Sequence, residues 1–142
     1  MIVNILEVII IFLSYLSKKG EVTAFLDELH TLLESDDFDI NTDLILIRKK
    51  QGDDQKLSTP FTLLDLDYDA EDVVERLKEL KVEEYSETKI DKDDVNPPIL
   101  FVFGKGIDGK LIYVKLKIRN QQKQVVCVSF HYAKDKMNFP YA

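Results

Sequence analysis

The stretch PILFVFGKGIDGKLIYVKLKIRNQQKQVVCVSFHY, residues 98–132, decides the fold of this chain. Within it, residues 111–119 alternate strictly between apolar and polar side chains. Side chains on a β-strand point alternately to two faces, so this pattern predicts a strand with two unlike faces. The apolar face consists of Ile112, Val114, Leu116 and Ile118. The opposite face consists of Tyr113, Lys115, Lys117 and Arg119 and is basic.

Two further strands are expected beside this one. Residues 124–131 are rich in valine and read as a strand, and residues 120–123 form the turn before it. Residues 99–103 are apolar and precede the segment 104–109, in which three glycines favour a tight hairpin turn over a ligand-binding loop. The sequence therefore predicts three consecutive antiparallel strands.

The first half of the chain supplies helices. Residues 21–35 repeat apolar side chains with the 3.6 period of an amphipathic helix, on which His30 falls among polar positions and is expected to be solvated. Residues 70–81 form a second helix, with Asp69 as its N-cap. A short strand is expected at 44–47. Helices followed by antiparallel strands indicate an α+β fold, a small antiparallel sheet with helices packed on one face.

Residues 1–16, MIVNILEVIIIFLSYL, form an apolar segment that is short for a membrane span and lacks the features of a signal peptide. We interpret residues 1–20 as a hydrophobic N-terminal extension and residues 21–142 as a single domain. A buried or partner-binding helix is the favoured reading of the apolar segment, and a short membrane anchor is the alternative.

Charge is distributed unevenly along the chain, whose formal net charge is −7. Residues 98–142 hold 8 of the 19 basic residues and only 2 of the 26 acidic ones. Such a basic end suits either a polyanion or the acidic half of the same domain. The single cysteine, Cys127, excludes an intrachain disulfide, and its valine neighbours favour a buried thiol. With two distant histidines, it offers no zinc-binding spacing, and we expect no metal and no cofactor.

Several segments, taken in order, resemble the MqsR family of toxins from bacterial type II toxin–antitoxin systems. That family has an LxLDFD-like segment, a helix, an FYKS-like turn, and two strands of VYLKITV and VLIVSFKE type. Here the counterparts are LDLDYD at 64–69, EYSE at 84–87, IYVKLK at 112–117 and VCVSF at 126–130. The lysine of the FYKS-like turn is replaced by Ser86. The resemblance covers residues 59–132, about half of the chain.

The resemblance implies a RelE-like fold, metal-independent cleavage of mRNA in the cytoplasm, and neutralisation by an antitoxin protein. The family's two tyrosines fall on Tyr85 and Tyr113. RNA and an antitoxin are thus the expected partners; DNA binding by the chain alone and a membrane partner are not expected.

Metal-free RNA cleavage needs a base, an acid and cations that stabilise charge on the phosphate. We expect Tyr113, Lys115, His131 and Tyr85 to act as the catalytic groups. RNA-binding residues are expected to be Lys117, Arg119 and Lys105. These residue types suit the chemistry because lysine and arginine bind phosphate and aromatic rings stack on unpaired bases.

Hairpin register decides whether His131 shares a face with Tyr113. A loop with an even number of residues places His131 on the opposite face, whereas an odd loop or a bulge brings the two together. Both registers remain open from the sequence. A non-catalytic interaction module is the alternative function; its basic strand face would bind an acidic partner segment, and residues 1–16 would contact a membrane or a second surface.

Overall fold

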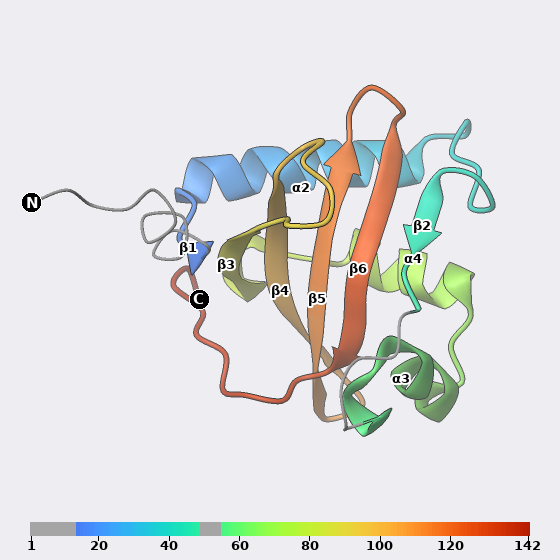
Figure 1. Ribbon diagram of the computed structural model, residues 1–142, viewed down its shortest axis with the longest axis vertical. Helices are drawn as coiled ribbons and strands as arrows, with labels where there is room; N and C mark the ends of the chain where they lie inside the picture. Colours follow the sequence, from blue (N-terminus) through green and yellow to red (C-terminus); the bar gives the residue numbers. More distant parts are fainter. Residues whose placement is uncertain (1–13, 49–54) are drawn as a thin grey trace, which may run out of the picture.

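The computed structural model describes residues 14–48 and 55–142. Residues 1–13, which include most of the apolar N-terminal segment, lie outside the described residues. The described part is an α+β fold built on one mixed sheet with the strand order β1-β3-β4-β5-β6-β2 (Figure 1). Its strands are β1 Ser14–Tyr15, β2 Leu44–Leu46, β3 Tyr85–Ile90, β4 Ile99–Ile107, β5 Lys110–Arg119 and β6 Gln124–Tyr132. Its helices are α2 Lys19–Glu34, α3 Thr59–Leu66 and α4 Ala70–Lys78, with short 3₁₀ turns η1 Gln55–Leu57 and η2 Val82–Glu84.

The predicted run of three antiparallel strands is confirmed as β4, β5 and β6. The β4–β5 connection is a two-residue turn at Asp108 and Gly109, both with positive φ, as tight hairpins require. The predicted small antiparallel sheet is wrong in size and in type, because the sheet has six strands and β2 runs parallel to β6. The short strand expected at 44–47 is confirmed as β2, Leu44–Leu46, whereas β1 and β3 were not predicted, so the sequence underestimated the width of the sheet.

The core lies between the sheet and the helices α2 and α4, which lie behind β4, β5 and β6 in Figure 1. The predicted apolar face of β5 is confirmed, since its four aliphatic side chains are at most 4% exposed. From α2 the core receives Phe25, which stacks on Phe101 of β4 with ring centroids 4.1 Å apart. We call this the inner face of the sheet and the opposite side the outer face.

Both predicted helices are present, with small shifts at their ends. Asp69 caps α4 as expected, accepting a hydrogen bond from the Asp72 backbone while the Asp72 side chain accepts one from the Asp69 backbone. The domain boundary expected between residues 20 and 21 falls inside α2, and β1 pairs with β3, so residues 14–20 belong to the domain. His30 is half-buried and its Nε2 has no hydrogen-bond partner, so the expected solvated side chain is wrong.

Helix α3 was not predicted, although Ser58 caps it and Pro60 lies in its first turn. Beyond the point where β2 ends, two threonines of α3 accept the backbone hydrogen bonds of β6. The hydroxyl of Thr59 accepts a hydrogen bond from the Phe130 backbone, and that of Thr62 accepts one from the Tyr132 backbone, each at 3.1 Å. This packing holds the end of β6, and therefore His131, in place.

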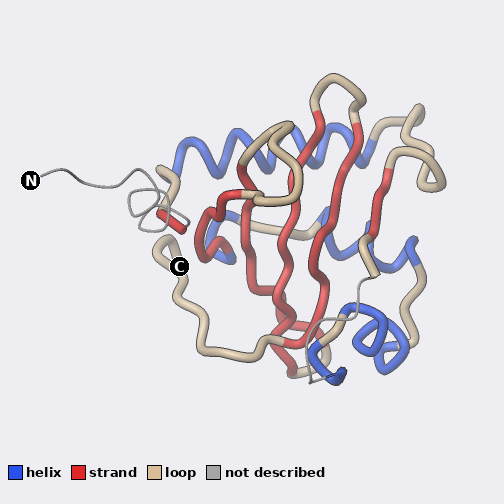
Figure 2. The backbone as a smooth tube through the Cα atoms, viewed as in Figure 1, coloured by secondary structure: helices blue, strands red, loops and turns tan. Residues whose placement is uncertain are grey.

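Two irregular segments cover the outer face. The loop 91–98 lies over the end of β5 nearest the β5–β6 turn, and the C-terminal tail, residues 133–142, runs from the end of β6 toward β1 (Figures 1 and 2). The aromatic tail therefore folds back onto the body. Between these two segments part of the outer face stays open.

Candidate functional site

A β-bulge in β6 brings Tyr113 and His131 onto the same face. The turn between β5 and β6 has four residues, and pairing begins with Arg119 opposite Gln124. After Leu116 pairs with Cys127 the register shifts, and Tyr113 then lies directly opposite His131. Val128 is the extra residue of the bulge, so the open question of register is resolved by a bulge and not by the loop length.

The two rings stack on each other. Their centroids lie 5.1 Å apart and their planes differ by 11°. Next along the same strands, Lys115 pairs with Ser129. Three of the expected site residues, Tyr113, Lys115 and His131, are thus neighbours on the outer face.

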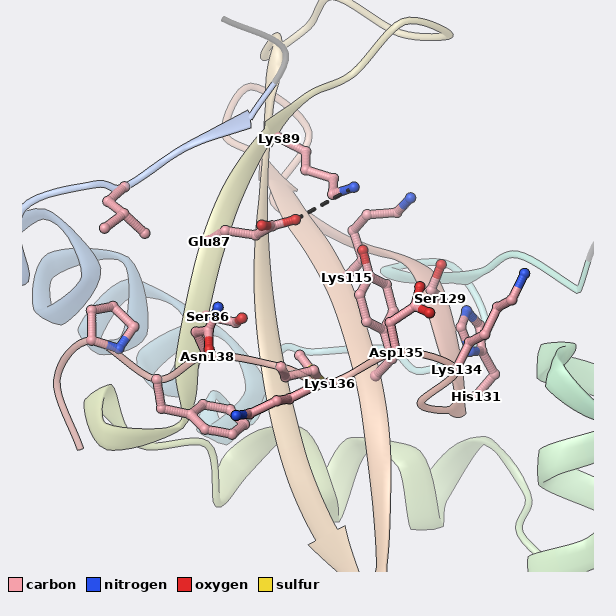
Figure 3. A pocket seen from close by; sticks show the side chains of 15 residues that line it. Ser86, Glu87, Lys89, Lys115, Ser129, His131, Lys134, Asp135, Lys136 and Asn138 are labelled. Carbon is pink, nitrogen blue, oxygen red and sulfur yellow. Dashed lines mark ion pairs between the residues drawn. The ribbon is translucent and has the colours of Figure 1, made fainter.

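These residues line an open pocket of about 770 Å³ between the outer face and the C-terminal tail. Figure 3 shows lysine side chains around it, from β3, from β5 and from the tail. The pocket lining contains four lysines, Lys89, Lys115, Lys134 and Lys136, and two carboxylates, Glu87 and Asp135. A chain with a net charge of −7 thus has a pocket that is locally basic.

The protonation of His131 follows from its contacts. Its Nδ1 lies 2.9 Å from the Tyr132 carbonyl oxygen, which only accepts hydrogen bonds, so Nδ1 carries the proton. Burial lowers the pKa of His131; the hydrogen bond to Tyr132 opposes this, and the Lys115 charge lowers the pKa further. The ring is therefore neutral at pH 7, with Nε2 unprotonated and able to accept a proton.

Tyr113 and Lys115 are shifted in opposite directions. Burial, with a smaller contribution from the Glu87 charge, raises the pKa of Tyr113 to about 12, so its hydroxyl keeps its proton. Burial and the neighbouring Lys89 charge lower the pKa of Lys115. The site thus combines a protonated phenol, a neutral imidazole and an ammonium group whose charge is not matched by an ion pair within the described part of the chain.

Some lining residues were missed in the sequence. Glu87 and Lys89 reach the pocket from β3 and form an ion pair with a separation of 3.4 Å. A register shift in β3 leaves Ser86 as the extra residue between Tyr85 and Glu87, and Ser86 lines the pocket as well. Alternation along 85–90 alone could not place them, because the bulge changes which residues face outward.

Tyr85 does not join the site. It is fully buried, and its hydroxyl is bonded to the Ser17 backbone at 2.8 Å and to the Thr88 hydroxyl at 2.6 Å. Its ring also contacts Phe103 with centroids 5.9 Å apart. The structure gives Tyr85 a role in the core, where it ties β1 to β3.

Lys117 and Arg119 are engaged by the loop 91–98 and do not form an open basic face. Lys117 is 1% exposed, and its Nζ lies 2.7 Å from an Asp91 carboxylate oxygen. It also donates hydrogen bonds to the carbonyl oxygens of Asp94 and Pro97. Arg119 binds the Asp94 carboxylate through two nitrogens. The expected exposure of Lys117 is wrong, because the acidic loop folds over it.

Lys105 lies apart from the pocket. Its Nζ is 3.2 Å from the Glu84 carboxylate and also approaches the Glu79 carbonyl oxygen. These contacts fasten the end of α4 and η2 to β4. Of the seven expected site residues, three meet in the pocket and four make contacts within the fold.

Cys127 is completely buried, and burial raises the pKa of its thiol to about 12, which suits a structural residue. Residues 14–48 and 55–142 contain no cluster of histidine, cysteine and carboxylate side chains arranged to hold a metal ion. In the same ranges no helix is long and apolar enough to cross a membrane. Comparisons with protein-family models, with curated proteins and with solved structures found no match to this chain.

Proposed function

We propose that this protein is a metal-independent endoribonuclease with a RelE-like fold, acting in the cytoplasm as the toxin of a type II toxin–antitoxin system. The observation that carries the proposal is the stacked pair Tyr113 and His131 beside Lys115 in an open basic pocket. This combination supplies a base, an acid and cations without requiring a metal. The resemblance of residues 59–132 to the MqsR family supports the toxin part of the proposal.

In the proposed reaction, the neutral Nε2 of His131 takes the proton from a ribose 2′-hydroxyl. The 2′-oxygen then bonds to the adjacent phosphorus, and the bond from phosphorus to the 5′-oxygen breaks. Tyr113 gives its proton to that leaving oxygen and regains one from the imidazolium of His131. The products are a 2′,3′-cyclic phosphate and a 5′-hydroxyl end. Lys115 and Lys89 stabilise the extra negative charge on the phosphate.

The remaining expected site residues take other parts in this proposal. Lys117, Arg119, Lys105 and Tyr85 are bonded within the fold and hold the sheet and its loops in place. In this proposal the lysines that line the pocket bind the phosphate in place of Lys117, Arg119 and Lys105. The alternative, a protein-binding module without catalysis, needs a basic strand face that is free to bind an acidic partner. Asp91 and Asp94 already pair with Lys117 and Arg119 of that face, so this alternative has less support.

The experiment that tests the function is incubation of the purified protein, free of antitoxin, with a long RNA in EDTA. Cleavage by the wild-type protein, and its loss in Tyr113→Phe and His131→Gln, is the expected result. His30→Gln and Tyr68→Phe are matched controls at residues that do not line the pocket, and each should cleave normally. Circular dichroism of all four variants checks that they fold.

Absence of cleavage on both free and ribosome-bound RNA would overturn the nuclease proposal. Expression in growing bacterial cells tests the toxin role separately. Growth should stop with the wild-type protein and continue with His131→Gln, and co-expression of the cognate antitoxin should restore it. Growth arrest by both forms would show that toxicity does not depend on the pocket.

A further inference from the structure

The C-terminal tail is held at both ends across the outer face. Where it leaves β6, the Ala133 backbone donates a hydrogen bond to the Leu111 carbonyl oxygen at 2.9 Å. At its far end, the Tyr141 ring stacks on buried Tyr85 with centroids 5.8 Å apart. The Tyr141 hydroxyl also donates a hydrogen bond to the Ser17 carbonyl oxygen. These contacts fix the course of the segment between them.

A third anchor depends on the absence of a side chain. Gly104 lies on β4 opposite Tyr113, and the Phe139 ring rests against it. A Cβ atom at position 104 would lie 2.7 Å from Phe139 Cζ, which is closer than real contacts allow. Gly104 therefore provides the space in which Phe139 packs.

Between the anchors, Lys134, Lys136 and Asn138 of the tail line the same pocket as Lys89 and Lys115 of the sheet (Figure 3). Lys134 and Lys136 are exposed, and neither makes an ion pair with another described residue. Four lysines and only two carboxylates line this one pocket, and like charges gathered there repel each other. An anionic ligand between the walls would relieve this repulsion.

We propose that the tail is a fixed wall of the binding site, in which Lys134 and Lys136 bind phosphates of a single-stranded nucleic acid lying between tail and sheet. The inference rests on the proposed function in taking RNA as the ligand, but it concerns binding and not cleavage. A single strand fits because its bases can stack on aromatic rings such as Tyr113 and Phe139. A duplex, whose bases are paired and stacked on one another, should therefore bind less tightly than a single strand.

The probe is a fluorescent single-stranded oligonucleotide made entirely of 2′-O-methyl ribose, which cannot be cut because it lacks the attacking hydroxyl. Its affinity is measured by anisotropy at several salt concentrations. The double variant Lys134→Ala/Lys136→Ala should bind at least about tenfold more weakly. Each lost phosphate contact lowers the salt slope by about 0.7, so the slope should fall by about 1.4. The matched control, Lys19→Ala/Lys123→Ala, removes two lysines outside the pocket and should bind as the wild type does.

The anchors are tested by Phe139→Ala and Gly104→Ala. Phe139→Ala removes the ring and Gly104→Ala displaces it, while both variants keep the two tail lysines in the chain, so affinity should fall while the salt slope stays close to that of the wild type. An unchanged affinity in the lysine double variant, or tighter binding of a duplex than of the single strand, would overturn the inference.

Failure of this inference can be told apart from failure of the proposed function. Normal binding by the tail variants, together with loss of RNA cleavage in Tyr113→Phe, would overturn the tail as a binding wall and leave the nuclease intact. Weakened binding by the tail variants, with no cleavage of free or ribosome-bound RNA by the wild type, would support the wall and overturn the nuclease. If the wild type cuts RNA without binding the oligonucleotide, the inference is overturned and the nuclease stands. If it does neither, both are overturned.

Discussion

The two halves of the outer face of β5 have similar sequences and different surroundings. Toward one end, Tyr113 and Lys115 line an open pocket. Toward the other, Lys117 and Arg119 are bound by the acidic loop 91–98. Lys115 and Lys117 are the same residue type two positions apart on one strand, yet one is free of ion pairs with described residues and the other has two.

The difference shows that the role of a lysine is set by what lies across from it. Lys117 is opposite a loop whose carboxylates and carbonyl oxygens satisfy all of its donors. Lys115 lines the pocket, where burial and then the charge of another lysine, Lys89, lower its pKa. One side chain therefore stabilises the fold, and the other is available to a ligand.

The largest effect is expected for Lys117→Met, which keeps the apolar stem and removes the charge. It leaves the Asp91 carboxylate, 7% exposed, without its partner, and a buried charge left alone costs about 3–5 kcal/mol. Urea unfolding measures the loss. The same change at position 115 is the control, and equal stabilities of the two variants would remove the distinction between the halves.

Lys115→Met should act on cleavage and not on stability. The lowered pKa of Lys115 means that the folded state disfavours its charge, so an uncharged side chain of similar length should leave the free energy of unfolding unchanged or slightly raised. Loss of one group that stabilises transition-state charge lowers turnover about 10²–10³-fold. Single-turnover rates with RNA in EDTA provide the measurement. A stable variant with full activity would exclude Lys115 from the reaction.

The rate of RNA cleavage in the pocket should also depend on pH, through His131. Since the base must be unprotonated and its pKa lies below the ordinary 6.5, cleavage should rise about tenfold per pH unit in acid and level off below pH 6.5. Rates measured from pH 4.5 to 8 test this. A plateau reached only above pH 7 would assign the base to another group. Any residual cleavage by His131→Gln should lack the acidic limb of the profile.

The stability contributed by Lys117 and Arg119, at the end of β5 covered by the loop 91–98, should also depend on pH. This dependence should lie at lower pH and be weaker than that of cleavage. Hydrogen bonds from Arg119 and then from Lys117 lower the pKa of Asp94 from 3.8 to about 2. A carboxyl group with a lowered folded-state pKa stabilises the fold above its unfolded pKa, and that contribution is lost as the pH falls through the folded value. Arg119→Gln should therefore be less stable than the wild type at pH 7, and the difference should shrink between pH 4 and 2. A difference that stays constant over this range would contradict the assignment.

Much of the sheet was predictable because its signals are local. The alternation in residues 111–119 and the hairpin turn within 104–109 need only neighbouring residues to be read; the structure confirms the alternation and places the turn at Asp108 and Gly109. Helix α3 was missed because its eight residues, from Thr59 to Leu66, are stabilised by contacts with β6 more than by a long amphipathic pattern. The parallel pairing of β2 with β6 joins segments about 80 residues apart, and no local pattern indicates it.

The candidate site was predictable only in part. Residue types and the resemblance pointed to Tyr113, Lys115 and His131, and the bulge at Val128 brought them together. Lys134 and Lys136 were known only as charges on an aromatic tail, and their place at the pocket depends on Phe139, Tyr141 and Gly104.

From its sequence alone this chain reveals its α+β class, its three central strands and the residues that face outward along β5. Those features follow from periodicity, which local backbone geometry imposes. Only the tertiary structure decided which outward residues are free, because ion pairing and burial depend on segments distant in the chain. The loop 91–98 neutralises Lys117 and Arg119, and the tail encloses Tyr113, Lys115 and His131.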